Sequence, residues 1–347
     1  MNPQKHILNP WVVVVLVVLL LATIVGSSLV GAVDINAEDL YKEFKLWVGQ
    51  CFGKENIDTA ELRTLWFFVQ LRLPRILMCV LVGGVLSVCG AAYQSIFRNP
   101  LTDPYVLGVS SGASLGAAVA ILLGWGAIQW GVSGLALATA LLTVLLIYKI
   151  ASIGNRMHTT TLLLTGVCFT LLISAVISFL MVMNHEKMDD IIFWTMGSFD
   201  PSRISWEDVE VMLPVAAVGI GVVLWYSRDL NLLLAGSEAA KSMGVEVEKV
   251  KRVLLLFTTL MVAFAVSSCG VIGFVGLIVP HAVRLVVGAD NRKVVPYSML
   301  CGALFVLVCD TLARTVLRPG ELPVGSLTSM VGAPLFIYLL YKSKKKY

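Results

Sequence analysis

Long apolar runs without Asp, Glu, Lys or Arg alternate with short polar segments along the chain. The runs cover residues 7–33, 76–97, 104–148, 157–185, 211–227, 253–283, 294–309 and 322–341. A helix needs about 20 apolar residues to cross a bilayer, so each run predicts at least one membrane span. The run 104–148 is long enough for two spans, with a break at Leu123–Gly134 where Trp125 and Trp130 are suited to the membrane interface. The run 253–283 is too long for one crossing, and we expect a short extra span at about 273–288.

Two further observations define the fold class. The 347 residues are 58% hydrophobic and only 14% charged, which excludes an ordinary soluble domain and indicates an integral membrane protein. The apolar core of the first run, Trp11–Val30, exceeds the roughly 7–15 residues of a signal peptide, so we expect a retained first helix. We therefore predict an all-α membrane protein with about ten transmembrane helices and a single transmembrane domain over residues 1–347. A nucleic-acid partner is not expected.

The distribution of basic residues predicts the orientation. Lys5 precedes the first run, and Lys342, Lys344, Lys345 and Lys346 follow the last one. By the positive-inside rule both termini are cytoplasmic, which requires an even number of spans. Segments 34–75, 184–210 and 313–325 then lie outside, and segments 97–104, 149–158, 228–252 and 288–295 lie inside.

A polar motif between two apolar runs, RNPLTDPYVLGVSSGAS, needs its own explanation. Arg98, Asn99 and Pro100 form a cytoplasmic turn in this topology, and Asp103 with Pro104 is typical of an N-cap followed by the first helical residue. Small residues follow: Ser110, Ser111, Gly112, Ser114 and Gly116. They are compatible with close helix packing through Gly112 and Gly116, or with the lining of a wet pathway.

The same motif contains Gly-Val-Ser-Ser-Gly, which fits the G-x-S-x-G pattern of a hydrolase nucleophile elbow. An elbow needs a strand-to-helix turn and a histidine base. The context here is a membrane helix, and His158 and His281 are the histidines near membrane depth. An intramembrane hydrolase is therefore the weakest alternative, and it predicts that Ser110 or Ser111 reacts with a fluorophosphonate.

Other chemistry has little support in the sequence. No second ligand lies at i+3 or i+4 from His281, and the seven cysteines are scattered, so we expect no metal site, disulfide or bound cofactor. The chain has no G-x-x-x-x-G-K-[ST] motif to bind a nucleotide phosphate. Energy for transport would come from a partner or from an ion gradient. Asp310, with Arg314 at i+4, is the one acid that qualifies as intramembrane, which argues against an ion-coupled secondary carrier but leaves that alternative open.

Four segments resemble a known family in the order in which they occur there. They are RNPLTDPYVLGVSSGASLG, LAGSEAAKSMGV, GVIGFVGLIVPHAVRLVVGADNRKVVP and ELPVGSLTSMVGAPLFIYLL. Together they resemble the iron-siderophore, haem and cobalamin uptake permeases of ABC importers. The resemblance implies a type II importer permease fold, a homodimer in the cell inner membrane, two ATPase subunits that hydrolyse ATP, and an extracytoplasmic binding protein. It favours a ferric siderophore as substrate, with cobalamin or haem as the alternative.

The resemblance also implies site residues, which are named here as expectations. The ATPase-coupling residues are Ser237, Glu238, Ala239, Ala240 and Gly244, where Ser237 is expected to cap a short helix that Gly244 ends. The binding protein is expected to dock through carboxylates that pair with Arg72, Arg75 and Arg314. Thr159 and Thr160 are gate candidates, and the translocation path is expected to include Arg98, Asn99, Pro100, Ser110, Ser111 and Gly112.

Overall fold

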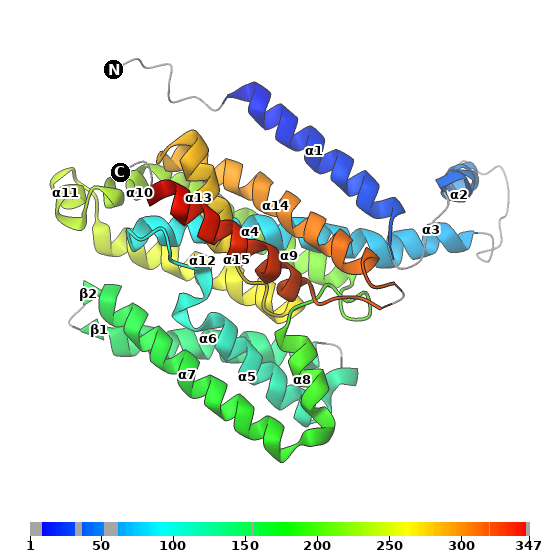
Figure 1. Cartoon of the computed structure of the whole chain (residues 1–347), viewed down its shortest axis with the longest axis horizontal. Helices are drawn as coiled ribbons and strands as arrows, with labels where there is room; N and C mark the ends of the chain where they lie inside the picture. The colour runs from blue at the N-terminus through cyan, green and yellow to red at the C-terminus, as the bar shows by residue number, and fades with distance from the viewer. Residues whose placement is uncertain are drawn as a thin grey trace.

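The protein is an α-helical bundle whose long helices run roughly along one axis (Figure 1). The computed structural model describes residues 9–31, 37–51, 62–128, 130–153, 156–157, 159–318 and 320–344. Lys5, His158, Lys345 and Lys346 lie outside the described residues. The charge argument for the termini therefore rests on the sequence.

Ten apolar helices are described, as predicted. Seven are long enough to cross a membrane: α1 (Pro10–Leu29), the continuous helical stretch Arg63–Ile96, α6 (Gly131–Ala151), α7 (Thr159–Met183), α9 (Trp206–Trp225), α12 (Val247–Cys269) and α14 (Asn291–Thr315). Three further apolar helical stretches are shorter: α5 (Val109–Leu122), α13 (Val275–Val287) and the part Val324–Leu339 of α15 (Val324–Lys344). A helix is present where the short extra span was expected at 273–288, namely α13, and it has 13 residues.

The remaining elements lie at the ends of the bundle. At one end are α2 (Ala37–Cys51), α3 (Arg63–Phe67), η3 (Phe68–Arg72), η5 (Trp125–Ala127), η6 (His185–Lys187) and α8 (Met188–Thr195). At the other are the antiparallel pair β1 (Ser152–Ile153) and β2 (Arg156–Met157), α10 (Ser227–Leu234) and α11 (Ser237–Ser242). One further element, η4 (Pro104–Leu107), lies inside the bundle instead, where Pro104 packs against Gly276 of α13. The start of α1 and the end of α15 point toward the same end as α10 and α11 (Figure 1), which agrees with an even number of crossings.

Helix α4 (Leu73–Ile96) forms the centre of the bundle and packs against α14, α13, α12 and α9. Glycines make its closest contacts. A Cβ at Gly90 would overlap the backbone of Gly276 on α13, and a Cβ at Gly83 would overlap that of Gly302 on α14. Small residues let membrane helices approach closely in this way, so dispersion contacts and backbone proximity hold the centre together.

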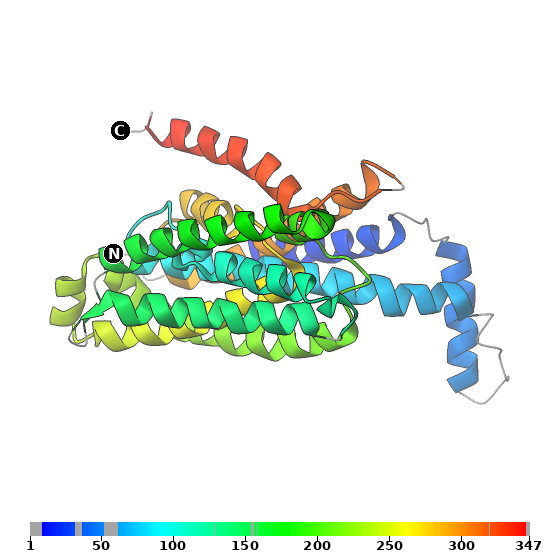
Figure 2. The same ribbon diagram turned by 90° about the horizontal axis from the view of Figure 1, so that it is seen from below.

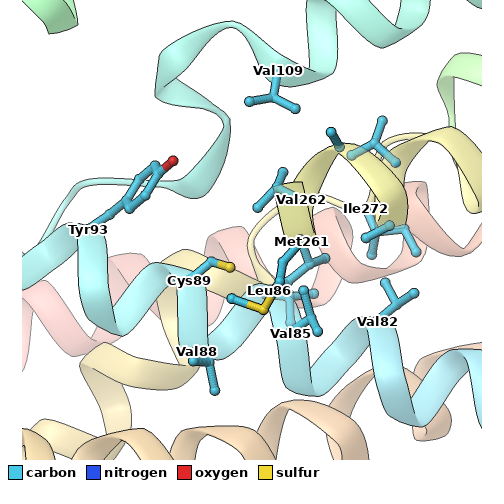
Figure 3. Close-up of a cluster of buried hydrophobic side chains, with 14 of the residues drawn as sticks. Val82, Val85, Leu86, Val88, Cys89, Tyr93, Val109, Met261, Val262 and Ile272 are labelled. Carbon is cyan, nitrogen blue, oxygen red and sulfur yellow. The ribbon is translucent and has the colours of Figure 1, made fainter. Parts of the chain in front are cut away.

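The core between α4 and α12 consists of tightly packed aliphatic side chains. Val85, Leu86 and Cys89 of α4 face Met261 and Val262 of α12 (Figure 3), and all five are at most 1% exposed. Because lipid tails are as apolar as these side chains, their packing density, and not removal from water, stabilises the contact.

Other helices are largely uncovered in the single chain. Only 11% of the apolar window of α1 and of α7 is buried, and α15 diverges from the rest of the bundle along its length (Figure 2). These faces are available to lipid or to another protein.

Two predicted loops contain structure that the apolar pattern did not indicate. The segment assigned to the outside at 34–75 contains the amphipathic helix α2, and the helix that carries Arg72 and Arg75 begins earlier, at Arg63. Glu43 Oε2 accepts a hydrogen bond of 2.7 Å from the Leu65 amide, which satisfies an otherwise unpaired N–H in the first turn of α3.

Candidate functional site

A buried cluster of charges lies where the outer parts of α4 and α14 meet. Arg75 Nη2 lies 2.8 Å from Asp310 Oδ1, and Arg314 Nε lies 2.9 Å from Asp310 Oδ2. Arg75 Nη1 also pairs at 2.9 Å with Glu321, which precedes α15. One carboxylate therefore neutralises parts of two arginines, and the cluster joins α4, α14 and the start of α15.

The arginines of this region also bind the end of α1. Arg72 Nη1 donates to the Ser28 carbonyl at 2.6 Å, and Arg314 Nη2 donates to Ser27 Oγ at 2.7 Å. Arg314 Nη1 also donates to the Val30 carbonyl at 3.3 Å. The last carbonyls of a helix lack partners within the helix and carry partial negative charge, so guanidinium groups stabilise them.

The three arginines expected to contact a binding protein are less exposed than such a docking role requires. Arg75 and Arg314 are each 3% exposed, and Arg72 is partly buried. Their guanidinium groups are held by Asp310 and by the end of α1, so in this conformation they do not form an open surface. Their role toward a binding protein stays a prediction.

The Arg98–Pro100 segment is confirmed as an exposed turn at the end of α4. Arg98 adopts a left-handed conformation with φ of 50°, and Asn99 Oδ1 accepts a hydrogen bond from the Leu101 amide. A Cβ at Gly236 would lie 3.5 Å from Arg98 Nη1, so the arginine lies beside the residue that precedes α11. The turn and α11 are therefore neighbours.

Asp103 begins a helix, as predicted, but a shorter one. Its side chain accepts from the Tyr105 amide at 2.8 Å and caps η4, and Gly108, with φ of 71°, separates η4 from α5. Burial raises the pKa of Asp103 to about 6, although the bond from Tyr105 favours the carboxylate. The membrane helix α5 itself starts at Val109.

The small-residue cluster of α5 serves helix packing. A Cβ at Gly112 would lie 2.5 Å from Thr143 Oγ1 on α6, and Gly116 approaches the same helix at Leu135. Ser111 donates to the Gly108 carbonyl at 3.0 Å, and its oxygen lies 3.4 Å from Thr170 Oγ1 of α7. Packing thus accounts for Gly112 and Gly116, and a pathway role for Ser110 and Ser111 stays a prediction.

The same geometry does not fit a nucleophile elbow. A 3₁₀ helix, and not a strand, precedes the serines, and Ser111 bonds to Gly108 and Thr170. His281 lies on α13, where its ring packs edge-on against Phe336 at 5.7 Å between centroids. The hydrolase alternative has no structural support.

Thr159 and Thr160 begin α7, and Thr160 is exposed. The exposed side of α7 also carries Ser174 and Ser178 among apolar residues. Hydroxyl groups on an uncovered membrane helix are compatible with a protein or aqueous neighbour as well as with lipid. The gate role of the two threonines stays a prediction.

The expected coupling residues lie on α11 and just beyond it. Glu238 is exposed and pairs with Lys241 Nζ at 3.0 Å, Ala240 is fully buried beneath the helix, and Gly244 follows in an exposed left-handed turn with φ of 86°. Ala239, between them, is partly buried. The expected cap at Ser237 is wrong, because Gly236 occupies the cap position with φ of 119° and Ser237 is the first helical residue. Lys251, on the first turns of the neighbouring α12, is only 5% exposed.

Sequence reasoning missed two sets of polar residues. Glu321 was not linked to Arg75, from which it is separated by 246 positions. Asn231, Arg284 and Asn291 form a network at the α10 end of the bundle. A signal was available for the second set, since Arg284 and Asn291 lie within one of the recognised segments. Within the described chain, no group of three or more His, Cys, Asp or Glu side chains could hold a metal ion.

Comparison with known proteins agrees with this architecture. The FecCD transport family matches residues 16–342. The cobalamin import system permease protein BtuC of Halobacterium salinarum is 47% identical over 78% of this chain and 72% of its own length. The vitamin B12 import system permease protein BtuC of Salmonella choleraesuis is 36% identical over 85% of this chain and 90% of its own length.

A solved structure extends the likeness to the fold. An inward-facing conformation of a metal-chelate type ABC transporter has a TM-score of 0.82 and 32% sequence identity. The match covers 96% of this chain and all of the other one. Almost every described helix thus has a counterpart in that transporter.

Proposed function

The chain belongs to the FecCD transport family and is a permease of the ABC importer class, and on that premise we propose that it passes a metal chelate from an extracytoplasmic binding protein to the cytoplasm. In this proposal the chain lies in the cell inner membrane with both termini in the cytoplasm. A separate ATPase supplies the energy, and no chemical step occurs on the substrate.

The observation that carries the proposal is the exposed helix α11. It protrudes at one end of the bundle beside α10 (Figure 1), and it offers the 88%-exposed carboxylate of Glu238 above a buried Ala240. A short rigid helix with exposed charge and a buried base suits insertion into a groove of a partner. We assign that groove to an ATPase subunit, with Ser237, Glu238, Ala239, Ala240 and Gly244 as the contact region.

A second copy of the chain completes the transporter. The uncovered polar stripe of α7, with Thr160, Ser174 and Ser178, and the divergent helix α15 support a pathway enclosed between two copies. Hydroxyl groups that line such a pathway can form hydrogen bonds with a polar substrate. Hydroxyl groups that face lipid find no hydrogen-bond partner there. Thr159 and Thr160 then narrow the inner mouth, and two copies recruit two ATPase subunits.

The chelate proposed first is cobalamin, because two relatives named above carry that activity in their names. A ferric siderophore, which the sequence resemblance favoured, and haem are tested beside it. The binding protein docks at the outer end, where Arg72, Arg75 and Arg314 lie. For Arg75 and Arg314 this docking requires that their contacts with Asp310 open.

An ion-coupled carrier is the alternative from another class. A proton-carrying acid must be free to change its charge, whereas Asp310 lies within 3 Å of both Arg75 and Arg314. Neutralising it would remove the carboxylate that two buried cations share, and Arg75 would keep only its contact with Glu321. This argues for ATP as the energy source.

The test is reconstitution with the cognate ATPase and binding protein, with uptake of labelled cyanocobalamin, ferric siderophore and haem measured in parallel. Glu238→Arg reverses a charge that is 88% exposed, so it preserves the fold. Asp190→Arg is the matched control, because Asp190 is also exposed and also pairs with a lysine three residues away, at the opposite end of the bundle. We expect ATP-dependent uptake of one chelate that Glu238→Arg abolishes and Asp190→Arg retains. Equal uptake in both variants would refute the coupling role of α11.

A further inference from the structure

Asn231 on α10 makes a reciprocal pair of hydrogen bonds with the turn that joins α13 to α14. Its Nδ2 donates to Asp290 Oδ1 at 2.6 Å, and its Oδ1 accepts from the Asn291 amide at 2.7 Å. Both ends of one amide side chain are therefore used on one turn. Such a two-point contact fixes the orientation of α10 relative to the turn as well as their distance. A rotation of either one would break at least one of the two hydrogen bonds.

The turn between α13 and α14 is also bonded to the central helix of the bundle. Asn291 is fully buried, and its Oδ1 accepts from Ser95 Oγ on α4 at 3.0 Å and from Arg284 Nη2 on α13 at 2.7 Å. Arg284 Nη2 also donates to Ser95 Oγ at 2.7 Å and to the Ala91 carbonyl at 3.0 Å. We call Asn231, Asp290, Asn291, Arg284 and Ser95 the inner clamp. It joins four helices, α4, α10, α13 and α14, through side chains.

The inner clamp lies next to α11. Helix α10 ends at Leu234 and α11 begins at Ser237, and the two helices pack against each other. A displacement of α11 is therefore transmitted to Asn231 over a separation of only two or three helical turns. Polar bonds in a low-dielectric surrounding are strong and directional, whereas apolar contacts allow sliding, so the clamp is a directional connection between α10 and the central helices.

We propose that Asn231, Asp290 and Asn291 are positioning residues that transmit movement of the ATPase-contacting helix α11 to α4, α13 and α14. The inference rests on the proposed function, since it presumes an ATPase at α11. It assigns to the clamp a role in coupling, in addition to its contribution to stability.

An exchange of the two side chains provides the sharpest test. Asn231→Asp brings a second carboxylate against Asp290 and breaks the contact by repulsion. Asp290→Asn alone keeps a side-chain oxygen that accepts from Asn231 Nδ2 and from the Arg292 amide, so it leaves the clamp and the N-cap of α14 intact. The double variant N231D/D290N removes the repulsion and restores the bond with donor and acceptor reversed, because the amide introduced at position 290 donates to the carboxylate introduced at position 231. The Arg292 amide then loses Asp290 Oδ1 as its cap, so the thermal stability of the double variant is compared with that of D290N. Asn184→Ala is the control, since the side chain of the exposed Asn184 donates locally, to the Leu180 carbonyl four residues earlier.

Two measurements are made on the full chain. In proteoliposomes with the ATPase and the cyanocobalamin-loaded binding protein, the number of chelates moved per ATP is expected to fall about fivefold or more in N231D, and to return in N231D/D290N. The rate of ATP hydrolysis is expected to stay within about twofold, which a general loss of structure would not allow. An unchanged ratio in N231D, or a loss that the exchange does not restore, would overturn the proposal.

The second measurement is independent of transport. Hydrogen–deuterium exchange of residues 227–243 in detergent is expected to rise in N231D and to return to the wild-type rate in N231D/D290N. No change in N231D would show that the clamp does not hold α10. Wild-type proteoliposomes that hydrolyse ATP but take up none of the three chelates would refute the proposed function instead, and the exchange measurement would then decide the clamp alone.

Discussion

Arg75 and Asp310 form an ion pair of 2.8 Å although they are separated by 235 positions in the chain, and their side chains are 3% and 0% exposed. The pair joins the two central helices α4 and α14 at their outer parts. An unpaired charge in a low-dielectric interior is costly, whereas a paired one holds its partners in a fixed arrangement.

Removing this carboxylate is expected to be strongly destabilising. Asp310→Ala leaves the buried Arg75 and Arg314 without their shared partner, which typically costs about 3–5 kcal/mol. Thermal unfolding in detergent measures the effect. The control Asp39→Asn removes a carboxylate that is 53% exposed and 3.9 Å from Lys42, and it should change the melting temperature little. Equal melting of Asp310→Ala and the wild type would contradict the assigned role of the pair.

Close approach of α4 and α13 predicts a contrast between two glycines. Gly90→Ala places a methyl group against the Gly276 backbone, and such overpacking costs about 1–3 kcal/mol. Gly221→Ala on α9 has no atom within 4 Å of the new methyl group, so it should be neutral or stabilise by up to about 1 kcal/mol. The melting temperature should fall in Gly90→Ala and should stay the same or rise in Gly221→Ala. A Gly90→Ala protein as stable as Gly221→Ala would show that α4 and α13 are further apart than described.

Asp103 predicts a pH dependence of stability. Its pKa is raised to about 6 from an ordinary 3.8, so between these values the folded chain binds more protons than the unfolded one. The free energy of unfolding should therefore fall as the pH rises from about 4 to about 6. Asp103→Asn keeps a side-chain acceptor for the Tyr105 amide and removes the titration. The difference in melting temperature between the variant and the wild type should grow in favour of the variant across this range, and a constant difference would rule out the shift.

The orientation can be tested by cysteine labelling in a chain in which Cys51 and Cys168 are replaced by serine. Ser202 and Ser242 are both exposed, at opposite ends of the bundle. A membrane-impermeant maleimide should label Ser202→Cys in intact cells, and Ser242→Cys only after permeabilisation. The reverse pattern would overturn the orientation derived from the basic residues.

The sequence predicted those features that depend on local pattern. Apolar runs indicated nine of the ten apolar helices, and the even number required by the charge distribution indicated the tenth. The spacing of Asp310 and Arg314 on one helix indicated their pairing, which the structure confirms at 2.9 Å. Partners on different helices could not be predicted in this way, because helix packing sets which faces meet. Arg75 was therefore assigned to carboxylates of a binding protein, although in the structure it faces Asp310, twelve positions after the start of its helix at Arg63.

Cap positions were a second limit. Ser237 has the residue type of an N-cap, but the positive φ of Gly236 allows the backbone to turn one residue earlier. In the same way Asp103 caps a 3₁₀ helix, and Gly108 interrupts the path before α5 begins. Residue type predicted that a helix starts nearby, and backbone conformation decided where.

The central claim is that ATP hydrolysis by a separate subunit drives import of a chelate through this permease. The most direct measurement compares uptake by proteoliposomes that contain the complete complex and ATP with uptake by the purified chain alone under a proton or sodium gradient. The account predicts accumulation of a metal chelate only with the complex and ATP, and no gradient-driven uptake by the chain alone. Accumulation driven by a gradient in the absence of the ATPase would contradict it.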